Sequence, residues 1–129
     1  MGMELLRKLT EVKIELGHRS YKLNVLGLYV LHSLSNGPKN GYDLLKELKR
    51  LTNNKWVPPK STIYPLLKKM VEEGLLDVDE HGVYSLTEAG RAVLKALRRN
   101  SEAINELEEN ISLILKIIEE IKSEVQTQE

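Results

Sequence analysis

The hydrophobic positions of this chain begin with helical spacing. From Glu4 to Leu16 apolar residues recur every three or four positions, which predicts an amphipathic helix that ends at Gly17. Residues 23–34 read LNVLGLYVLHSL and are apolar nearly all round, as expected of a helix at the centre of a small core. The chain is therefore predicted to open with helices.

A turn cluster, SNGPKNG at residues 35–41, then interrupts this spacing. Asn40 is placed to cap the helix YDLLKELKRL that follows, because its side chain can accept from an amide of the first turn. After the loop NNKWVPPK, Ser61 is expected to cap a further helix that ends at Gly74. Pro65 lies in the first turn of that helix, where few N–H groups have intrahelical partners and a proline costs least.

Beyond Gly74 the period of the pattern changes. Residues 76–79 and 83–86 are short alternating runs on either side of a turn at residues 80–82, which predicts a β-hairpin. Thr87 is then placed to cap the last helix.

The last helix carries a heptad of apolar residues, the pattern of a coiled coil. The repeated positions are Leu97, Ile104, Ile111, Ile118 and Val125, with Leu107, Ile114 and Ile121 interleaved. Asn100 interrupts the heptad near its start. Such a long apolar seam has too little partner surface within its own chain, so we expect a homodimer, with an intrachain helical hairpin as the alternative. The predicted dimer interface comprises Leu5, Leu9, Ile104, Leu107, Ile111, Ile114, Leu115, Ile118 and Ile121.

Composition narrows the class of protein. The chain has 129 residues, 41% of them hydrophobic, which suggests one compact domain with an extended element. The absence of cysteine excludes disulfides, thiolate metal sites and cysteine catalysis. No apolar stretch reaches the roughly 18 residues of a membrane span, and no signal peptide is evident. We therefore expect a cytoplasmic protein that does not bind membranes.

The sequence carries no enzyme motif. The patterns of zinc hydrolases, nucleotide-binding loops and nucleophile elbows are all missing. His18, His32 and His81 lie far apart in the sequence, and His32 is expected in the core or an interface. We therefore predict a protein that is not an enzyme and that holds neither a metal nor a cofactor.

The net charge of zero hides an asymmetry. Residues 1–70 contain 13 Lys/Arg and 5 Asp/Glu, whereas residues 71–129 contain 6 Lys/Arg and 14 Asp/Glu. This distribution suggests an anion-binding front and an acidic rear, although chance clustering of solvated charges would look the same.

The order of the predicted elements is that of a winged helix-turn-helix. We therefore predict a mainly α fold with a two-stranded β-hairpin wing and a long C-terminal dimerisation helix. The predicted domains are an N-terminal helix assisting dimerisation at residues 1–17, a DNA-binding domain at 18–87 and the dimerisation helix at 88–129.

In this fold the helix at residues 61–73 enters the DNA major groove, with the free amides of its first turn available to a phosphate. Tyr64 and Tyr42 are each suited either to contact DNA or to pack within the protein. Trp56 is predicted to be a packing anchor, with ligand stacking as the alternative. The candidate DNA-binding residues are Lys39, Asn40, Tyr42, Lys60, Ser61, Thr62, Tyr64, Lys68 and Lys69.

Several motifs together resemble the PadR family of transcriptional regulators. They are LGL at residues 26–28, GP and GY within 37–42, IYP at 63–65, GLL at 74–76 and YSLTEAG at 84–90. The resemblance covers about residues 23–97. It implies a cytoplasmic, dimeric repressor that binds double-stranded DNA. In the family the C-terminal helix forms the dimer with help from the N-terminal helix. It also implies DNA contacts by Tyr42, Ser61, Thr62, Tyr64 and nearby lysines.

Two departures from the family pattern matter. The short wing carries Asp77, Asp79 and Glu80, which leaves His81 at its tip as the candidate contact with DNA. The C-terminal helix has no aromatic residue on which a flat ligand could stack, so a small-molecule inducer stays unspecified. The alternative function is a winged-helix protein–protein interaction module without specific DNA binding.

Overall fold

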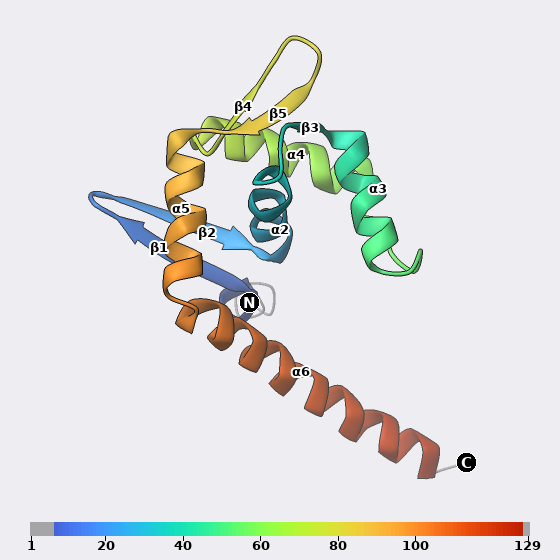
Figure 1. Ribbon diagram of the computed structural model, residues 1–129. Coiled ribbons are helices and arrows are strands. Elements are labelled where there is room, and N and C mark those ends of the chain that lie inside the picture. Colours follow the sequence, from blue (N-terminus) through green and yellow to red (C-terminus); the bar gives the residue numbers. More distant parts are fainter. Residues whose placement is uncertain (1–6, 128–129) are drawn as a thin grey trace. The chain divides into compact units, whose positions relative to one another are not determined.

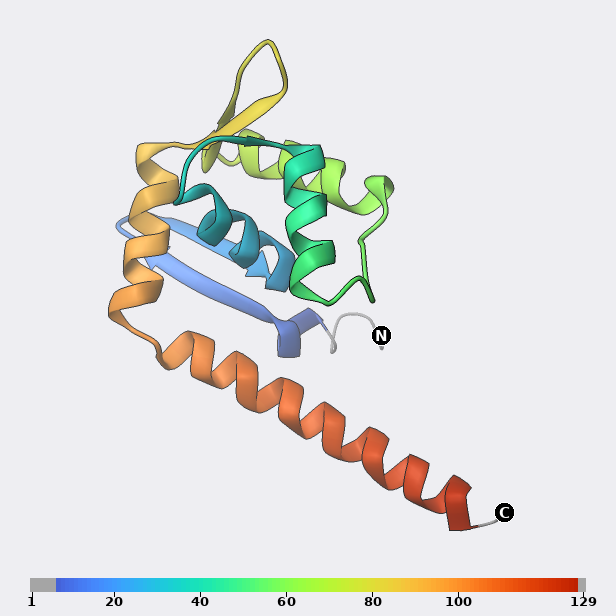
Figure 2. The ribbon, with the colours of Figure 1, turned by 45° about the vertical axis from the view of Figure 1, so that its right-hand side comes forward.

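The computed structural model describes residues 7–127, which divide into two compact units. One unit comprises the segment up to Val25 together with the segment from Leu97 onward, and the other is Leu26–Ala96. Figures 1 and 2 show the helices and strands of both. Within residues 7–127 no helix is both long enough and apolar enough to cross a membrane.

The unit Leu26–Ala96 is a winged helix-turn-helix (Figure 1), as predicted. Its helices are α2 (Val25–Leu34), α3 (Gly41–Leu51), α4 (Lys60–Glu72) and most of α5 (Glu88–Arg99). Its antiparallel sheet has the order β3-β5-β4, formed by β3 (Lys39–Asn40), β4 (Leu76–Val78) and β5 (Val83–Leu86). The β4–β5 hairpin was predicted, whereas β3 is too short to show an alternating pattern.

The core of this unit is built from aliphatic side chains. Leu31 of α2, Leu44 of α3 and Val93 of α5 are completely buried. On α4, Ile63 and Leu67 are also completely buried. Because these two residues direct one side of α4 into the core, the opposite side of the helix faces outward.

Two predicted helix caps are confirmed. The Asn40 side chain accepts from the Asp43 amide at 2.8 Å at the start of α3. The Thr87 hydroxyl accepts from the Gly90 amide at 3.0 Å and donates to the Gly74 carbonyl at 2.6 Å. Thr87 therefore also joins the start of α5 to the end of α4.

The predicted cap at Ser61 is wrong. The N-cap of α4 is Pro59, whose carbonyl accepts from the amides of Thr62 and Ile63 at 2.9 and 3.2 Å. Pro59, which has an extended backbone, thus accepts the first hydrogen bonds of the helix through its carbonyl. The helix starts at Lys60, one residue before Ser61. Ser61 consequently lies inside the first turn, where its side chain is exposed.

The predicted helix from Glu4 to Leu16 is wrong in its described part beyond Thr10. A helical turn at residues 7–10 leads into a hairpin of β1 (Glu11–Leu16) and β2 (Arg19–Asn24). Gly17, with φ +61°, occupies the first central position of the two-residue turn, as a type II′ hairpin requires.

Cross-strand pairing explains why the strand pattern prevails over the helical one. Val12 lies opposite Leu23 and Ile14 opposite Tyr21, and all four side chains are buried. A helix over the same residues would satisfy Val12 and Leu16 but would leave Ile14 off the apolar stripe. The β-branched residues at alternate positions therefore favour the hairpin.

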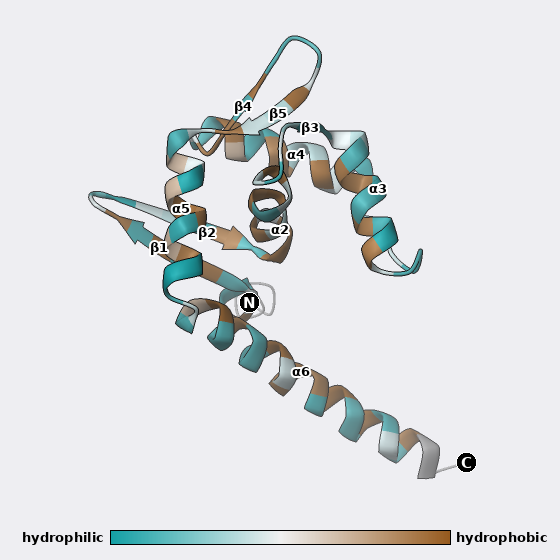
Figure 3. Cartoon of the chain, in the orientation of Figure 1, coloured by the Kyte–Doolittle hydropathy of each residue, from teal (hydrophilic) through white to brown (hydrophobic). Residues whose placement is uncertain are grey.

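The predicted C-terminal helix is divided into α5 and α6 (Glu102–Thr127). Asn100 lies between them and its side chain accepts from the Glu102 amide at 3.1 Å, so the interruption expected at this residue ends one helix and caps the next. Along α6, apolar residues alternate with polar ones (Figure 3). Most of these apolar side chains are exposed in the single chain.

Candidate nucleic-acid interface

The outward side of α4 gathers polar and basic side chains. Lys60, Ser61 and Thr62 are exposed in its first turn, and Lys68 and Lys69 are exposed further along. Lys69 approaches Glu73 at 3.8 Å, but its side chain is 65% exposed, so this ion pair is weak. The predicted recognition helix therefore offers hydroxyl and ammonium donors on one surface.

The two candidate tyrosines differ in their surroundings. Tyr42 is 61% exposed, and the Lys46 Nζ lies 5.4 Å from the centre of its ring, so the alternative of a packed Tyr42 is excluded. Tyr64 is 39% exposed, and one edge of its ring lies against Gly41. Tyr64 thus both packs within the protein and reaches the surface.

Lys39 does not belong to this surface, contrary to prediction. Its Nζ lies 2.7 Å from Glu47 Oε2 and donates to the Ser33 carbonyl and hydroxyl at 3.0 and 2.8 Å. An ammonium has three N–H donors, and all of them are used within the protein. Asn40 beside it uses its side-chain oxygen as the cap of α3.

Glu47 is the centre of a polar network that the sequence did not reveal. Its Oε1 accepts from the hydroxyls of Tyr29 and Ser33 at 3.2 and 2.8 Å, in addition to the Lys39 ion pair. Burial raises the pKa of Glu47, but hydrogen bonds from Lys39 and Ser33, the Lys39 charge and Tyr29 outweigh it and lower the pKa overall. The network joins α2, β3 and α3 through charged Glu47.

We expect Glu47→Gln to reduce the free energy of unfolding by about 1–2 kcal/mol near neutral pH, because the charged hydrogen bonds weaken. A lowered carboxyl pKa contributes stability above the unfolded-state pKa, and this contribution disappears as the pH falls through the folded-state pKa. In urea unfolding, the free energies of wild type and variant should therefore converge as the pH falls through the lowered pKa of Glu47. Glu80→Gln, at an exposed wing position, is the control. A pH-independent difference between wild type and Glu47→Gln would contradict this explanation.

Asp79, one of the acidic residues of the wing, has a structural role. The Asp79 carboxylate accepts from the amides of His81 and Val83 at 2.8 and 2.9 Å, which closes the turn between β4 and β5. The hydrogen bond from the Val83 amide lowers the pKa of Asp79, desolvation opposes this effect, and the His81 amide and charge lower the pKa further. Asp79 is thus part of the turn, and His81 stays exposed at its tip.

A family comparison identifies the chain. The model of the transcriptional regulator PadR-like family matches residues 30–96, more than half of the sequence. This chain belongs to the PadR-like family. The match covers α3, α4, the wing, half of α2 and most of α5.

The PadR-like chain is similar to several individual proteins. It is 34% identical over 85 residues to the transcriptional regulator YqjI of Escherichia coli K12, covering 63% of this chain and 41% of YqjI. The chain thus spans less than half of that relative. Protein TA0346 of Thermoplasma acidophilum is 31% identical in a structural match with TM-score 0.47, covering 77% of this chain and 91% of TA0346. The complex structure of hsRosR-S1 matches with 18% identity and TM-score 0.53, covering 77% and 95% of the two chains, which supports the fold alone.

Two motif glycines of this PadR-like chain allow close packing. A Cβ on Gly90 would lie 2.3 Å from the Leu75 carbonyl oxygen, so α5 can approach the end of α4 only without a side chain here. A Cβ on Gly41 would lie 2.6 Å from Cε1 of Tyr64. The GY and IYP motifs, distant in sequence, therefore meet in the fold.

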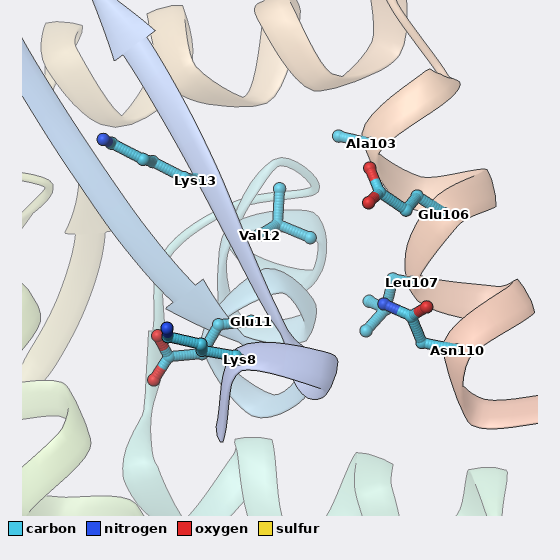
Figure 4. A pocket seen from close by; sticks show the side chains of 8 residues that line it. All are labelled: Lys8, Glu11, Val12, Lys13, Ala103, Glu106, Leu107 and Asn110. Atoms are coloured by element: carbon cyan, nitrogen blue, oxygen red, sulfur yellow. The ribbon is translucent and has the colours of Figure 1, made fainter. Parts of the chain in front are cut away.

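The other unit of the PadR-like chain contains a small cleft between β1 and α6 (Figure 4). It has a volume of about 240 Å³, and Val12 and Leu107 contribute apolar surface to it. Charged residues of both signs line it: Lys8, Glu11, Lys13 and Glu106. Because charges of both signs line the cleft, unlike the basic side of α4, the cleft is not part of the candidate nucleic-acid interface.

Trp56, the predicted packing anchor of the α3–α4 loop, is only partly buried. Its side chain is 47% exposed. The anchor of the α3–α4 loop is Thr52, whose hydroxyl accepts from the Trp56 amide at 3.2 Å and donates to the Trp56 carbonyl at 2.9 Å. Asn53 and Asn54 have positive φ angles of 55° and 64°, which asparagine tolerates better than most residues.

Proposed function

We propose that this PadR-like protein binds a specific inverted-repeat operator as a homodimer and represses transcription there. The observation that carries the proposal is the exposed side of α4, with Ser61 and Thr62 in the first turn and lysines at both ends of the surface. Hydroxyls and free amides at the start of a helix suit phosphates and base edges, and lysines add affinity that does not depend on sequence. The resemblance to PadR repressors supports the repressor role and a cytoplasmic site of action.

The same surface argues against a protein-docking function. Among the exposed large hydrophobic side chains of the described residues, α4 contributes Tyr64 alone. Docking surfaces between proteins need an apolar, desolvated centre, and the remaining exposed residues of α4 are mainly polar or basic. DNA therefore fits this surface better than a protein partner.

The apolar seam of α6 supports the homodimer. Its heptad residues Ile104, Ile111, Ile118 and Val125 are between 37% and 57% exposed, on a helix of about 39 Å. Exposed aliphatic residues at this spacing are the pattern of a coiled-coil partner surface. Ile121 is also exposed and Ile114 is half-buried, and exposed Leu115 widens the seam beyond two helices.

Leu107 and Leu9, two residues of the predicted dimer interface, differ in burial within their own chain. Leu107 is only 8% exposed, and it lines the cleft between α6 and β1 of its own chain, so we remove it from the proposed interface. Asn110 follows it on the same helix and donates to the Leu9 carbonyl at 3.1 Å. Leu9 is half-buried and stays in the proposal, whereas Leu5 lies outside the described residues.

Fluorescence anisotropy tests the proposed function. We expect the protein to bind DNA from upstream of its own gene more tightly than a scrambled duplex, with affinity falling steeply as salt increases. Equal, weak binding to both duplexes would contradict specific recognition. A lack of binding even at low salt would contradict DNA binding altogether and favour the interaction-module alternative.

A further inference from the structure

The GY and IYP motifs meet where the Tyr64 ring lies against Gly41. A Cβ on Gly41 would lie 2.6, 2.8 and 2.9 Å from Cε1, Cζ and Oη of Tyr64. Real Cβ atoms essentially never approach other heavy atoms this closely. The phenol end of Tyr64 therefore occupies the space that a side chain at position 41 would take.

The backbone does not explain the glycine. The residues with positive φ include Gly17, Gly37, Gly74 and Gly82, but Gly41 is not among them. Gly41 is the first residue of α3 and follows its N-cap, a position that an alanine could occupy without backbone strain. The need for glycine thus comes from the Tyr64 ring.

The Tyr64 ring also lies near the wing. Burial raises the pKa of Tyr84 on β5, and the neighbouring Tyr64 phenol raises it further. Tyr84 in turn pairs with Lys39 of β3, immediately before α3. The ring of Tyr64 thus lies between α4 and the start of α3, and its phenol interacts electrostatically with Tyr84 of β5.

We propose that Tyr64 is a positioning residue whose ring, seated on Gly41, sets the direction in which the first turn of α4 presents Ser61 and Thr62. This inference rests on the proposed DNA-binding function. Ile63 and Leu67 are buried and hold the inner side of α4 against the core. They do not fix the rotation of the first turn of α4, for which a contact at the side of the helix is needed. Tyr64 provides that lateral contact through its ring.

A double-mutant cycle tests the contact without removing the tyrosine. Gly41→Ala should displace the Tyr64 ring, which is the far end of a flexible side chain, and lower operator affinity about tenfold or more. In a Tyr64→Ala background the same Gly41→Ala change should cost nothing further. Tyr64→Phe keeps the ring and should lose much less affinity than Tyr64→Ala. Affinities for operator and scrambled duplexes are measured by anisotropy.

Two further measurements separate positioning from general destabilisation. The thermal midpoint of Gly41→Ala should stay near that of the wild type, because alanine is the better helix former. The variant should lose preference for the operator over the scrambled duplex while its salt dependence, set by phosphate contacts, stays unchanged. Lys68→Ala is the matched control on α4, and its effect on affinity should add to that of Gly41→Ala.

Three outcomes would overturn the positioning role. They are wild-type affinity of Gly41→Ala, an equal loss from Gly41→Ala in the Tyr64→Ala background, and a loss from Tyr64→Phe as large as that from Tyr64→Ala. The wild-type protein in the same titration keeps the two proposals apart. If the wild type shows no preference for the operator, the proposed function fails as well. If the wild type prefers the operator and Gly41→Ala binds it equally tightly, the positioning role alone is rejected.

Discussion

A protein carrying Ile111→Asp and Ile118→Asp is expected to be a monomer in sedimentation equilibrium at concentrations where the wild type is a dimer. Both side chains are exposed in the single chain, at 42% and 47%, so the substitutions should leave its fold intact. In a dimer each carboxylate would be buried without a partner, which costs several kcal/mol per interface. Circular dichroism should show unchanged helix content apart from the free end of α6.

The monomer should also lose operator affinity by on the order of 100-fold or more, because each chain then holds only one half-site. Ser112→Asp adds a carboxylate to the same helix at an exposed position outside the heptad and is the matched control. It should leave both the dimer and the affinity unchanged. A double Asp variant that remains dimeric would show that the chains associate through another surface.

Replacing Lys68 and Lys69 by alanine is expected to weaken binding to every duplex alike, on the order of 100-fold at moderate salt. A dimer would lose roughly four phosphate contacts, and the slope of log affinity against log salt should become shallower by about 3–4. Lys116→Ala with Lys122→Ala removes the same charge from α6 and should have little effect. An unchanged slope in the α4 variant would contradict phosphate contacts by these lysines.

Thr62→Ala is expected to change sequence preference, in contrast to the lysine variant. Thr62 is exposed in the first turn of α4, where the major-groove edge of a base would be read. Its loss should change the preferred base at one position of each half-site and leave the salt slope unchanged. If Thr62→Ala and the lysine variant have the same effects, the assignment of Thr62 to base reading is wrong.

Much of the winged helix-turn-helix could be predicted from the sequence because its signals are local. Asn40 and Thr87 are caps that act within one helical turn, and the wing pattern alternates over consecutive residues. The exposed side of α4 follows from the burial of Ile63 and Leu67 at helical spacing. Such features depend on neighbours close in the chain.

The parts that could not be predicted depend on distant partners. The β1–β2 hairpin prevails because Ile14 meets Tyr21 across the turn, although Val12 and Leu16 suit a helix equally well. The sequence assigns Lys39 to a basic surface, whereas the fold pairs it with Glu47. The contact of Tyr64 with Gly41 likewise joins residues that no periodic pattern relates.

Recognition of DNA by a symmetric dimer is tested by selecting DNA from a random duplex library with the 129-residue protein. We expect an inverted repeat to be enriched, with half-site centres about 10 base pairs or 34 Å apart, so that two α4 helices enter successive major grooves. The complex should contain two protein chains per duplex. Recovery of no motif, or of a single asymmetric site bound by one chain, would contradict recognition by a symmetric dimer.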